Sequence, residues 1–149
     1  MKPHIGVIGA GKCSEEISIL AEEVGREIAR SGGILLCGGL GGVMEAASRG
    51  CNKEGGTVVG ILPTDKPTDA NDYVEVVITT SMGHGRNAII AQSADVLIAV
   101  AGEYGTLSEI ALSLAMGKKV VCLKSQWNIE GTYPVDTPEK AVEKAFSFI

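Results

Sequence analysis

The stretch from Val96 to Ala101 is the most apolar run in the sequence, and it constrains the fold more than any other segment. It lacks the polar alternation of a half-exposed strand, which is typical of a strand buried on both faces of a parallel sheet. Residues 107–117 then carry apolar side chains at helical spacing and end in Gly117, which predicts a helix with a glycine at its carboxyl end. A buried strand that leads directly into a helix is the repeating unit of an α/β fold.

The same alternation of strand and helix runs along the whole chain. Strands are expected at residues 5–8, 34–37, 56–62, 74–78, 96–101 and 119–123. Helices are expected at residues 17–30, 43–49, 87–93, 107–117 and 137–148, the last with Thr137 as its N-cap. Because aromatic residues make up only 4% of the chain, the core must consist mainly of Val, Ile, Leu and Ala. The pattern predicts one Rossmann-like domain over residues 1–149, with a doubly wound, mainly parallel sheet and helices on both faces.

Charge and cysteine content exclude several classes of protein. The net charge of −5 argues against general nucleic-acid binding, which needs a basic surface, but it permits a small anionic ligand. The cysteines are too scattered to predict a zinc site or a disulfide framework, so we expect no metal site and no cofactor required for folding. Cys37 and Cys122 fall in strand patterns as small core residues, whereas Cys13 lies in a loop, where a reactive thiol is the alternative.

No segment of the sequence resembles a signal peptide or a membrane span, because the first apolar run is short and ends in a glycine turn. We therefore expect a cytoplasmic protein with no membrane partner.

The turn after the apolar run is a candidate ligand-binding loop. Gly102 and Gly105 permit a sharp turn and a close approach of the backbone to a ligand. Thr106 is expected as the N-cap of the next helix, and Glu109 would complete a capping box. A helix N-terminus at the end of a central strand suits a phosphate group. The alternative is that Thr106 and Glu109 only cap the helix.

Two earlier strands also end in glycine-rich turns. Residues 9–14 look like the start of a dinucleotide fingerprint, but Ser14 occupies the position of the third glycine. No acidic residue ends the strand at 34–37, so a standard NAD site is not predicted. Residues 38–42 contain four glycines, whose use is either close approach to a phosphate or tight packing of helix on strand.

The carboxyl ends of parallel strands meet at one edge of the sheet, so these turns are expected to form one site. The predicted ligand-binding residues are Gly9, Gly11, Lys12, Ser14, Gly38, Gly39, Gly41, Gly42, Glu45, Arg86, Asn87, Gly102, Gly105 and Thr106. Arg86 supplies the charge suited to two-pronged recognition of a phosphate or carboxylate. Glu109 is expected to be ionised, because a helix N-terminus lowers the pKa of a carboxyl group. His84 is either an acid or base or an exposed bystander. Residues 64–72 are the expected lid or rim.

These residues resemble a known superfamily. The segments 38–46, 86–87 and 105–109 are similar to those of the lysine-decarboxylase-like proteins. That group includes the LONELY GUY phosphoribohydrolases and the molybdenum cofactor carrier proteins, with a more distant likeness to DprA-type Rossmann proteins. The resemblance implies that Arg86 and Glu109 match catalytic residues that cleave the N-glycosidic bond of a nucleoside monophosphate. It also implies that Gly105 and Thr106 bind phosphate.

The chain departs from the phosphoribohydrolase signature PGGxGTxxE at two positions, where Ala101 and Glu103 replace the proline and the second glycine. These departures and the short chain resemble the cofactor-carrier branch. The leading hypothesis is therefore a carrier-like protein that binds a phosphorylated nucleotide or pterin, such as molybdenum cofactor. The alternatives are a nucleoside 5′-monophosphate phosphoribohydrolase and a scaffold without a ligand. The resemblance also implies a homo-oligomer, either a dimer or a tetramer.

Overall fold

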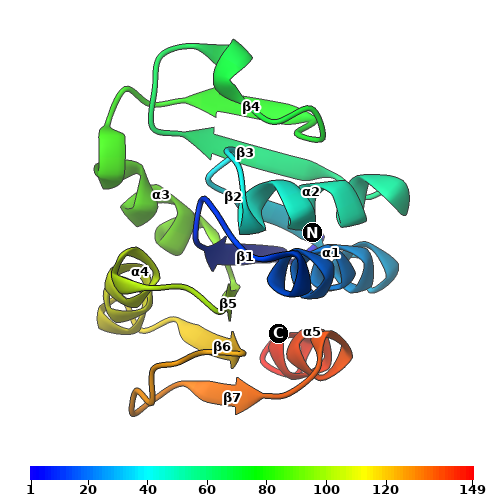
Figure 1. Cartoon of the computed structure of the whole chain (residues 1–149), viewed down its shortest axis with the longest axis vertical. Helices are drawn as coiled ribbons and strands as arrows, with labels where there is room; N and C mark the ends of the chain where they lie inside the picture. The colour runs from blue at the N-terminus through cyan, green and yellow to red at the C-terminus, as the bar shows by residue number, and fades with distance from the viewer.

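A seven-stranded sheet runs through the centre of the molecule in the computed structural model, which describes residues 1–149 (Figure 1). Every pair of neighbouring strands is parallel, in the order β4-β3-β2-β1-β5-β6-β7. The strands are β1 (His4–Gly9), β2 (Ile34–Cys37), β3 (Val58–Leu62), β4 (Val76–Thr79), β5 (Val96–Val100), β6 (Lys119–Leu123) and β7 (Tyr133–Val135). The predicted α/β fold with a doubly wound parallel sheet is confirmed.

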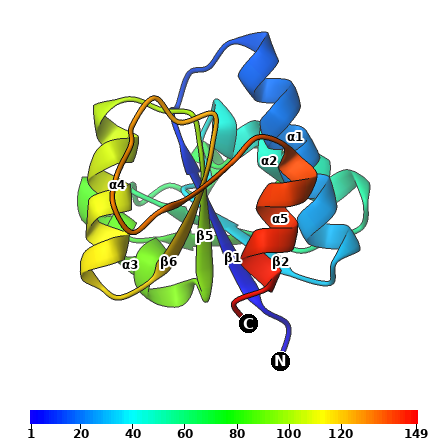
Figure 2. The ribbon, with the colours of Figure 1, turned by 90° about the horizontal axis from the view of Figure 1, so that it is seen from below.

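Five α-helices cover both faces of this sheet. They are α1 (Glu15–Arg30), α2 (Val43–Lys53), α3 (Arg86–Ser93), α4 (Tyr104–Ala115) and α5 (Pro138–Phe146). Short 3₁₀ turns, η1 (Pro67–Asp69) and η2 (Gly83–Gly85), precede β4 and α3. Helices α1, α2 and α5 lie on one face and α3 and α4 on the other (Figure 2). None of the helices has both the length and the apolar character needed to cross a membrane.

The central strand β5 shows how the two layers share the sheet. All five of its residues are buried, as the apolar run predicts. Val96, Ile98 and Val100 join the core cluster under α1, α2 and α5, whereas Leu97 and Ala99 join the cluster under α3 and α4. A strand with a core on each side needs apolar residues at every position, which explains the absence of alternation.

The order of the strands places a topological switch point between β1 and β5. The chain builds outward from β1 to β4 and then returns to lay β5 along the other side of β1, with Ile5 opposite Val96. The loops that follow β1 and β5 therefore leave the sheet in opposite directions and open a crevice between them. Ligands of open α/β sheets bind at such a crevice.

β7 was not predicted from the sequence, in which the last expected strand was residues 119–123. The strand has only three residues and includes Pro134, which has no N–H group to donate. It occupies the edge of the sheet beside β6, where a proline is tolerated and only one neighbour is needed.

The predicted end of the second helix at Gly50 is also wrong, because α2 continues to Lys53. Gly50 lies where α2 crosses α1, and a methyl group added there would overlap the carbonyl oxygen of Glu22. Gly25 of α1 makes the reciprocal contact with the carbonyl of Ala47. The glycine is present for helix-on-helix packing and does not cap the helix.

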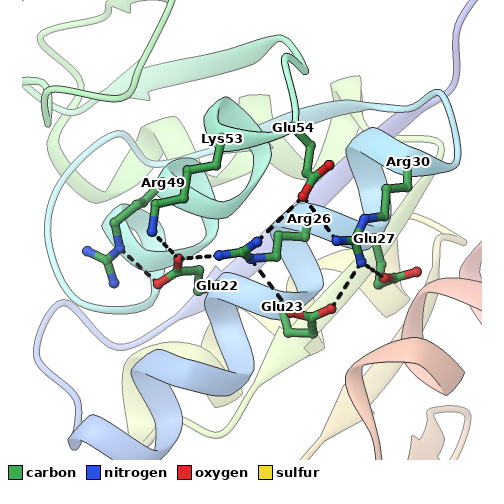
Figure 3. Close-up of polar contacts among 8 residues, drawn as sticks. All are labelled: Glu22, Glu23, Arg26, Glu27, Arg30, Arg49, Lys53 and Glu54. Carbon is green, nitrogen blue, oxygen red and sulfur yellow. Dashed lines mark hydrogen bonds and ion pairs between the residues drawn. The ribbon is translucent and has the colours of Figure 1, made fainter.

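A network of ion pairs joins these two helices (Figure 3). Glu22 accepts from Arg49 at 2.9 Å, from Lys53 at 2.8 Å and from Arg26 at 3.2 Å. The hydrogen bond from Lys53 is the main reason that the pKa of Glu22 falls to about 2. Glu54, which follows α2, accepts from Arg30 at 3.0 Å. The network adds to the glycine-mediated packing and fixes α2 on α1.

Candidate functional site

A cleft of about 430 Å³ lies at the carboxyl edge of the sheet, between the loops after β1, β2 and β5 and the helices α3 and α4. The predicted site residues that line it are Gly9, Gly11, Gly38, Arg86, Asn87, Gly105, Thr106 and Glu109. The structure thus brings together residues that are up to a hundred positions apart in the sequence. Residues that the sequence prediction left out also line it: Val7, Ile8, Ala10, Met44, Glu103, Ser108 and Leu112.

Arg86 is the buried cation of this cleft and is only 7% exposed. Its Nε donates to the carbonyl of Ile61 at 2.8 Å, one terminal nitrogen donates to the carbonyl of Gly38 at 3.3 Å, and the other donates to the side chain of Asn87. A guanidinium has five N–H groups, so these three bonds leave two for a ligand. Burial lowers the pKa of Arg86, although the charge of Glu109 opposes that shift.

No carboxylate pairs with Arg86, because none of the nine ion pairs of the structure includes it. A buried cation that makes no ion pair is costly to keep in a folded protein, and the charge of Glu109 in the same cleft offsets only part of that cost. The neutral carbonyls around Arg86 orient it without neutralising it. The cleft is therefore suited to an anion.

Gly38 makes room for this arginine. A side chain at position 38 would overlap the guanidinium of Arg86 and the sulfur of Met44. Gly9 is required in a similar way, since a side chain there would overlap Val43 at the start of α2. Two of the predicted phosphate-binding glycines thus have packing roles: Gly38 positions the cation, and Gly9 seats α2 on β1.

The N-terminus of α4 reaches the cleft, but its cap differs from the prediction. The helix begins at Tyr104, with Glu103 as its N-cap and no side-chain cap bond, so Thr106 lies inside the first turn and does not cap it. The first intrahelical bond is donated by Leu107 to the carbonyl of Glu103, at 2.9 Å. The preceding N–H groups of Tyr104, Gly105 and Thr106 have no carbonyl of their own helix to bind. The capping box of Thr106 and Glu109 is therefore wrong, while the free N–H groups suit an anion.

The turn before α4 has an unusual backbone. Ala101 adopts φ +48° and Gly102 φ +97°, both in the left-handed region. The buried side chain of Thr106 packs against Gly102, where a side chain would overlap it. Thr106 therefore holds the turn, and Gly102 is required both for its φ and for this contact. The sequence pointed to these residues as phosphate binders, whereas the structure also shows how they shape the loop.

The prediction that the helix N-terminus lowers the pKa of Glu109 is also wrong, because that pKa is raised to about 7. Burial in the cleft disfavours the charged form, and the attraction of Arg86 offsets only part of that effect. Glu109 lies in the second turn of α4, past the first turn where the helix dipole acts most strongly. The group is thus poised to exchange a proton near neutral pH.

The remaining predicted residues lie around the cleft and not in it. Lys12, Ser14, Gly42 and Glu45 line one hollow beside the cleft, together with Gly11. Gly102 lines another hollow, together with Lys12 and Ser14. Gly42 adopts φ +61° at the start of α2. The N–H of Val43 bonds to the carbonyl of Ala10 at 3.0 Å, so the first donor of α2 is already used. Gly39 and Gly41 line none of these hollows, and Gly39 instead packs against Leu62.

The alternatives that the sequence left open are also placed by the structure. His84 lines the cleft and is exposed. Burial raises the pKa of Cys13, which disfavours the thiolate.

Residues 64–72, the expected lid or rim, do not line the cleft. Asn71 donates to the carbonyl of Leu40 at 2.9 Å, so this loop is fastened to the glycine turn after β2. No group of three or more His, Cys, Asp or Glu side chains is arranged to hold a metal ion.

Comparison with known protein families gives a match over nearly the whole chain. The model of the SLOG cluster4 family matches residues 2–146. An uncharacterized protein of Archaeoglobus fulgidus is 52% identical, over 97% of this chain and 95% of its own length. A cytokinin riboside 5′-monophosphate phosphoribohydrolase of Arabidopsis thaliana is 32% identical over 93% of this chain. The chain spans only 62% of the length of that relative.

Solved structures of the same fold include proteins that bind molybdenum cofactor. The molybdenum cofactor binding protein of Rippkaea orientalis superposes with a TM-score of 0.94 at 36% identity, covering 99% of this chain and 97% of its own. The molybdenum cofactor carrier protein of Chlamydomonas reinhardtii gives a TM-score of 0.92 at 36% identity, covering 99% and 98%. DNA processing protein A of Streptococcus pneumoniae gives 0.79 at 18% identity, covering 96% and 61%, which shows a shared fold alone.

Proposed function

The chain belongs to the SLOG cluster4 family, and on that premise we propose that it is a carrier-like protein that binds a phosphorylated nucleotide or pterin in the Arg86 cleft. The observation that carries the proposal is Arg86 itself, a buried cation with no carboxylate partner. A phosphate group would form the ion pair that Arg86 lacks and accept from the two remaining N–H groups. The free N–H groups of α4 would bind further oxygens of the same phosphate.

Molybdenum cofactor is one ligand that fits this description. Two structural neighbours with 36% identity over nearly their full length are named for binding or carrying it. The part of such a ligand that this cleft recognises is its phosphate, through Arg86 and the first turn of α4. A cleft of about 430 Å³ also lies within the usual range for a small-molecule site.

The backbone of the turn after β5 favours a carrier over a phosphoribohydrolase. Proline is confined to φ near −65°, so it cannot occupy position 101 with the φ of +48° that Ala101 adopts. The turn of this chain therefore differs in conformation from one built on the sequence PGG. In addition, the exposed carboxylate of Glu103 stands beside the cleft where that signature has a glycine.

A nucleoside 5′-monophosphate phosphoribohydrolase is the second candidate, and one observation favours it. Glu109 and Arg86 line the same cleft, and the pKa of Glu109 near 7 suits a group that gives or takes a proton. In this reading Arg86 holds the phosphate and Glu109 assists cleavage of the bond between sugar and base. The 32% identity to a phosphoribohydrolase supports the candidate.

The decisive experiment measures binding and turnover together. Purified protein is incubated with a panel of nucleoside monophosphates while free base is measured, and thermal shifts are recorded with the same compounds and with molybdenum cofactor. Thermal stabilisation without base release supports the carrier. Base release that disappears in Glu109→Gln supports the phosphoribohydrolase and overturns the carrier.

Arg86→Lys tests whether the cleft binds the phosphate in either case. We expect a loss of about tenfold or more in affinity, because a lysine keeps the charge but cannot donate from a planar fork. Arg26→Lys, in the network between α1 and α2, is the matched control and should leave affinity unchanged. Equal affinity of Arg86→Lys and the wild type would remove Arg86 from the site.

A further inference from the structure

A second hollow, of about 600 Å³, adjoins the Arg86 cleft at the switch point between β1 and β5. It is formed by the loops after β1, β5 and β6 together with the first turn of α1 and Val43 at the start of α2. Ala10 and Glu103 line both this hollow and the Arg86 cleft, so the two spaces share a wall and lie side by side. A ligand held in one is in reach of the other.

Two lysines line this second hollow. Lys12 follows β1 and Lys124 follows β6, so each comes from the carboxyl end of a strand. Both side chains are exposed, and neither takes part in an ion pair. The charge of Lys124 helps to lower the pKa of Asp136, but the two do not form an ion pair. Both ammonium groups are therefore available to a ligand.

The loop that carries Lys124 is fixed in place. Lys124 adopts φ +55°, a conformation that a residue with a side chain rarely adopts without support from its surroundings. Two residues later, Gln126 donates to the carbonyl of Gly102 at 3.0 Å. This bond joins the loop after β6 to the turn that begins α4, and so couples the wall of the hollow to the wall of the cleft.

Charge also distinguishes this hollow from its neighbour on the other side of Lys12. That neighbour, which Lys12 also lines, contains the carboxylates of Glu15 and Glu45, and its arginine, Arg49, is already paired with Glu22 at 2.9 Å. The hollow of Lys12 and Lys124 holds two unpaired cations against one carboxylate, that of Glu103 on the shared wall. In a chain with a net charge of −5, such a site is a local exception.

We propose that this hollow is a second anion subsite, and that the ligand carries two anionic groups, one on each side of Glu103. The inference rests on the proposed function, since the first anionic group is the phosphate held by Arg86. Lys12 and Lys124 bind the second group. Glu103 lies on the wall between the cleft and the hollow, and its carboxylate repels negative charge there. The two anionic groups of the ligand must therefore be separated, with one on each side of this wall. The ligand class is a bisphosphate or another phosphorylated ring with a second, distant acidic group.

The test compares three probes by isothermal titration calorimetry: AMP, ADP and adenosine 3′,5′-bisphosphate. AMP offers one phosphate, ADP two adjacent ones and the bisphosphate two separated ones. We expect the wild type to bind the bisphosphate about tenfold tighter than AMP, and ADP to gain less. Salt screens exposed charges such as those of the two lysines. The affinity advantage of the bisphosphate over AMP should therefore shrink as the salt concentration is raised from 50 to 200 mM.

Lys12→Met and Lys124→Met should each remove most of this advantage while leaving the affinity for AMP within about twofold of the wild type. Lys66→Met is the matched control, because Lys66 is exposed, makes no ion pair and lines none of the hollows described here. If AMP binds but the bisphosphate binds no tighter, the second subsite is wrong and the proposed function stands. If neither compound binds, the second subsite is wrong, and the thermal shifts with molybdenum cofactor then decide the proposed function.

Discussion

At the scale of single residues, the site depends on polar groups that the fold buries. Arg86 is positioned by carbonyl groups and not by a carboxylate, so its charge remains available to a ligand. Glu109 faces the same cleft, and its burial raises its pKa to about 7. Glu103 stands at the rim, exposed and without a cap bond. Each of these three side chains leads to a measurable consequence.

Glu109→Gln should change stability in a way that depends on pH. The pKa of Glu109 rises from 4.5 to about 7 on folding, so folding takes up a proton between these values. The free energy of unfolding of the wild type therefore falls as pH rises from about 4.5 to about 7, and the loss is complete above that. The variant lacks this penalty and should be more stable above pH 7, by up to about 3 kcal/mol.

Chemical denaturation at pH 5 and pH 8 measures the effect of Glu109→Gln. The increase in the free energy of unfolding of the variant over the wild type should be small at pH 5, because the carboxyl group of Glu109 is largely protonated in the folded protein at that pH. An equal difference between variant and wild type at both pH values would contradict the raised pKa.

Glu103→Gln should strengthen binding of a monophosphate. The substitution removes an exposed negative charge from the wall of the cleft and keeps the size of the side chain. Because exposed charge pairs contribute up to about 1 kcal/mol, we expect the affinity for AMP to rise about three- to fivefold. Glu130→Gln, an exposed residue that lines none of the hollows, corrects for the change in net charge. A weaker affinity in Glu103→Gln would show that the carboxylate contacts the ligand favourably.

At the scale of elements, the packing of α1 against α2 positions the glycine turn between β2 and α2. Gly25 and Gly50 allow the two helices to touch backbone to backbone, and the ion pairs of Glu22 join the same two helices (Figure 3). Because α2 follows directly from Gly42, its seating on α1 determines where the turn at 38–42 lies. A defect at the crossing should therefore reach the site.

Gly50→Ala should destabilise the protein by about 3 kcal/mol, because the added methyl group overlaps the carbonyl oxygen of Glu22 and the helices must separate. Thermal and chemical denaturation measure the loss. Gly105→Ala is the matched control, since an added methyl group there meets no atom within 4 Å. That variant should be neutral or slightly more stable, as expected for a glycine replaced in a helix. Similar losses in the two variants would show that the crossing is not tightly packed.

At the scale of the whole molecule, the two layers of helices differ in their outer surfaces. The outward side of α1 is charged, whereas α4 exposes Tyr104, Ala111 and Ala115 beside Ser108, and Met116 at its C-cap is exposed as well. A helix that is apolar on its outward side as well as its inward side is usually covered in the functional assembly. We propose that the chain forms a homo-oligomer through the outward side of α4.

Ala115→Glu tests this interface. The charge should dissociate the assembly, and light scattering coupled to size-exclusion chromatography should show a fall in mass relative to the wild type. Ile19→Glu places the same charge at an exposed apolar residue of α1, on the opposite face of the sheet, and should leave the mass unchanged. A wild type that is monomeric at all concentrations would overturn the proposal.

The sequence by itself determined the class of fold, and it predicted eight of the sixteen residues that line the Arg86 cleft. Fully apolar strands followed by helices admit few arrangements other than a doubly wound parallel sheet, and parallel strands must gather their carboxyl-end turns at one edge. These are local patterns with a global consequence. The sequence therefore predicted that Gly38, Arg86 and Gly105 meet, and the structure places all three in one cleft.

The tertiary structure alone decided the properties that depend on neighbours distant in the chain. Gly50 looked like a helix end, because nothing in the sequence shows that α1 crosses it at that point. β7 was missed because a three-residue edge strand with a proline is stabilised by pairing with β6 and not by its own pattern. Glu109 was expected to have a low pKa from its place in a helix. Its pKa is high because burial is a property of the folded cleft, and in this cleft the cost of desolvation exceeds the attraction of Arg86.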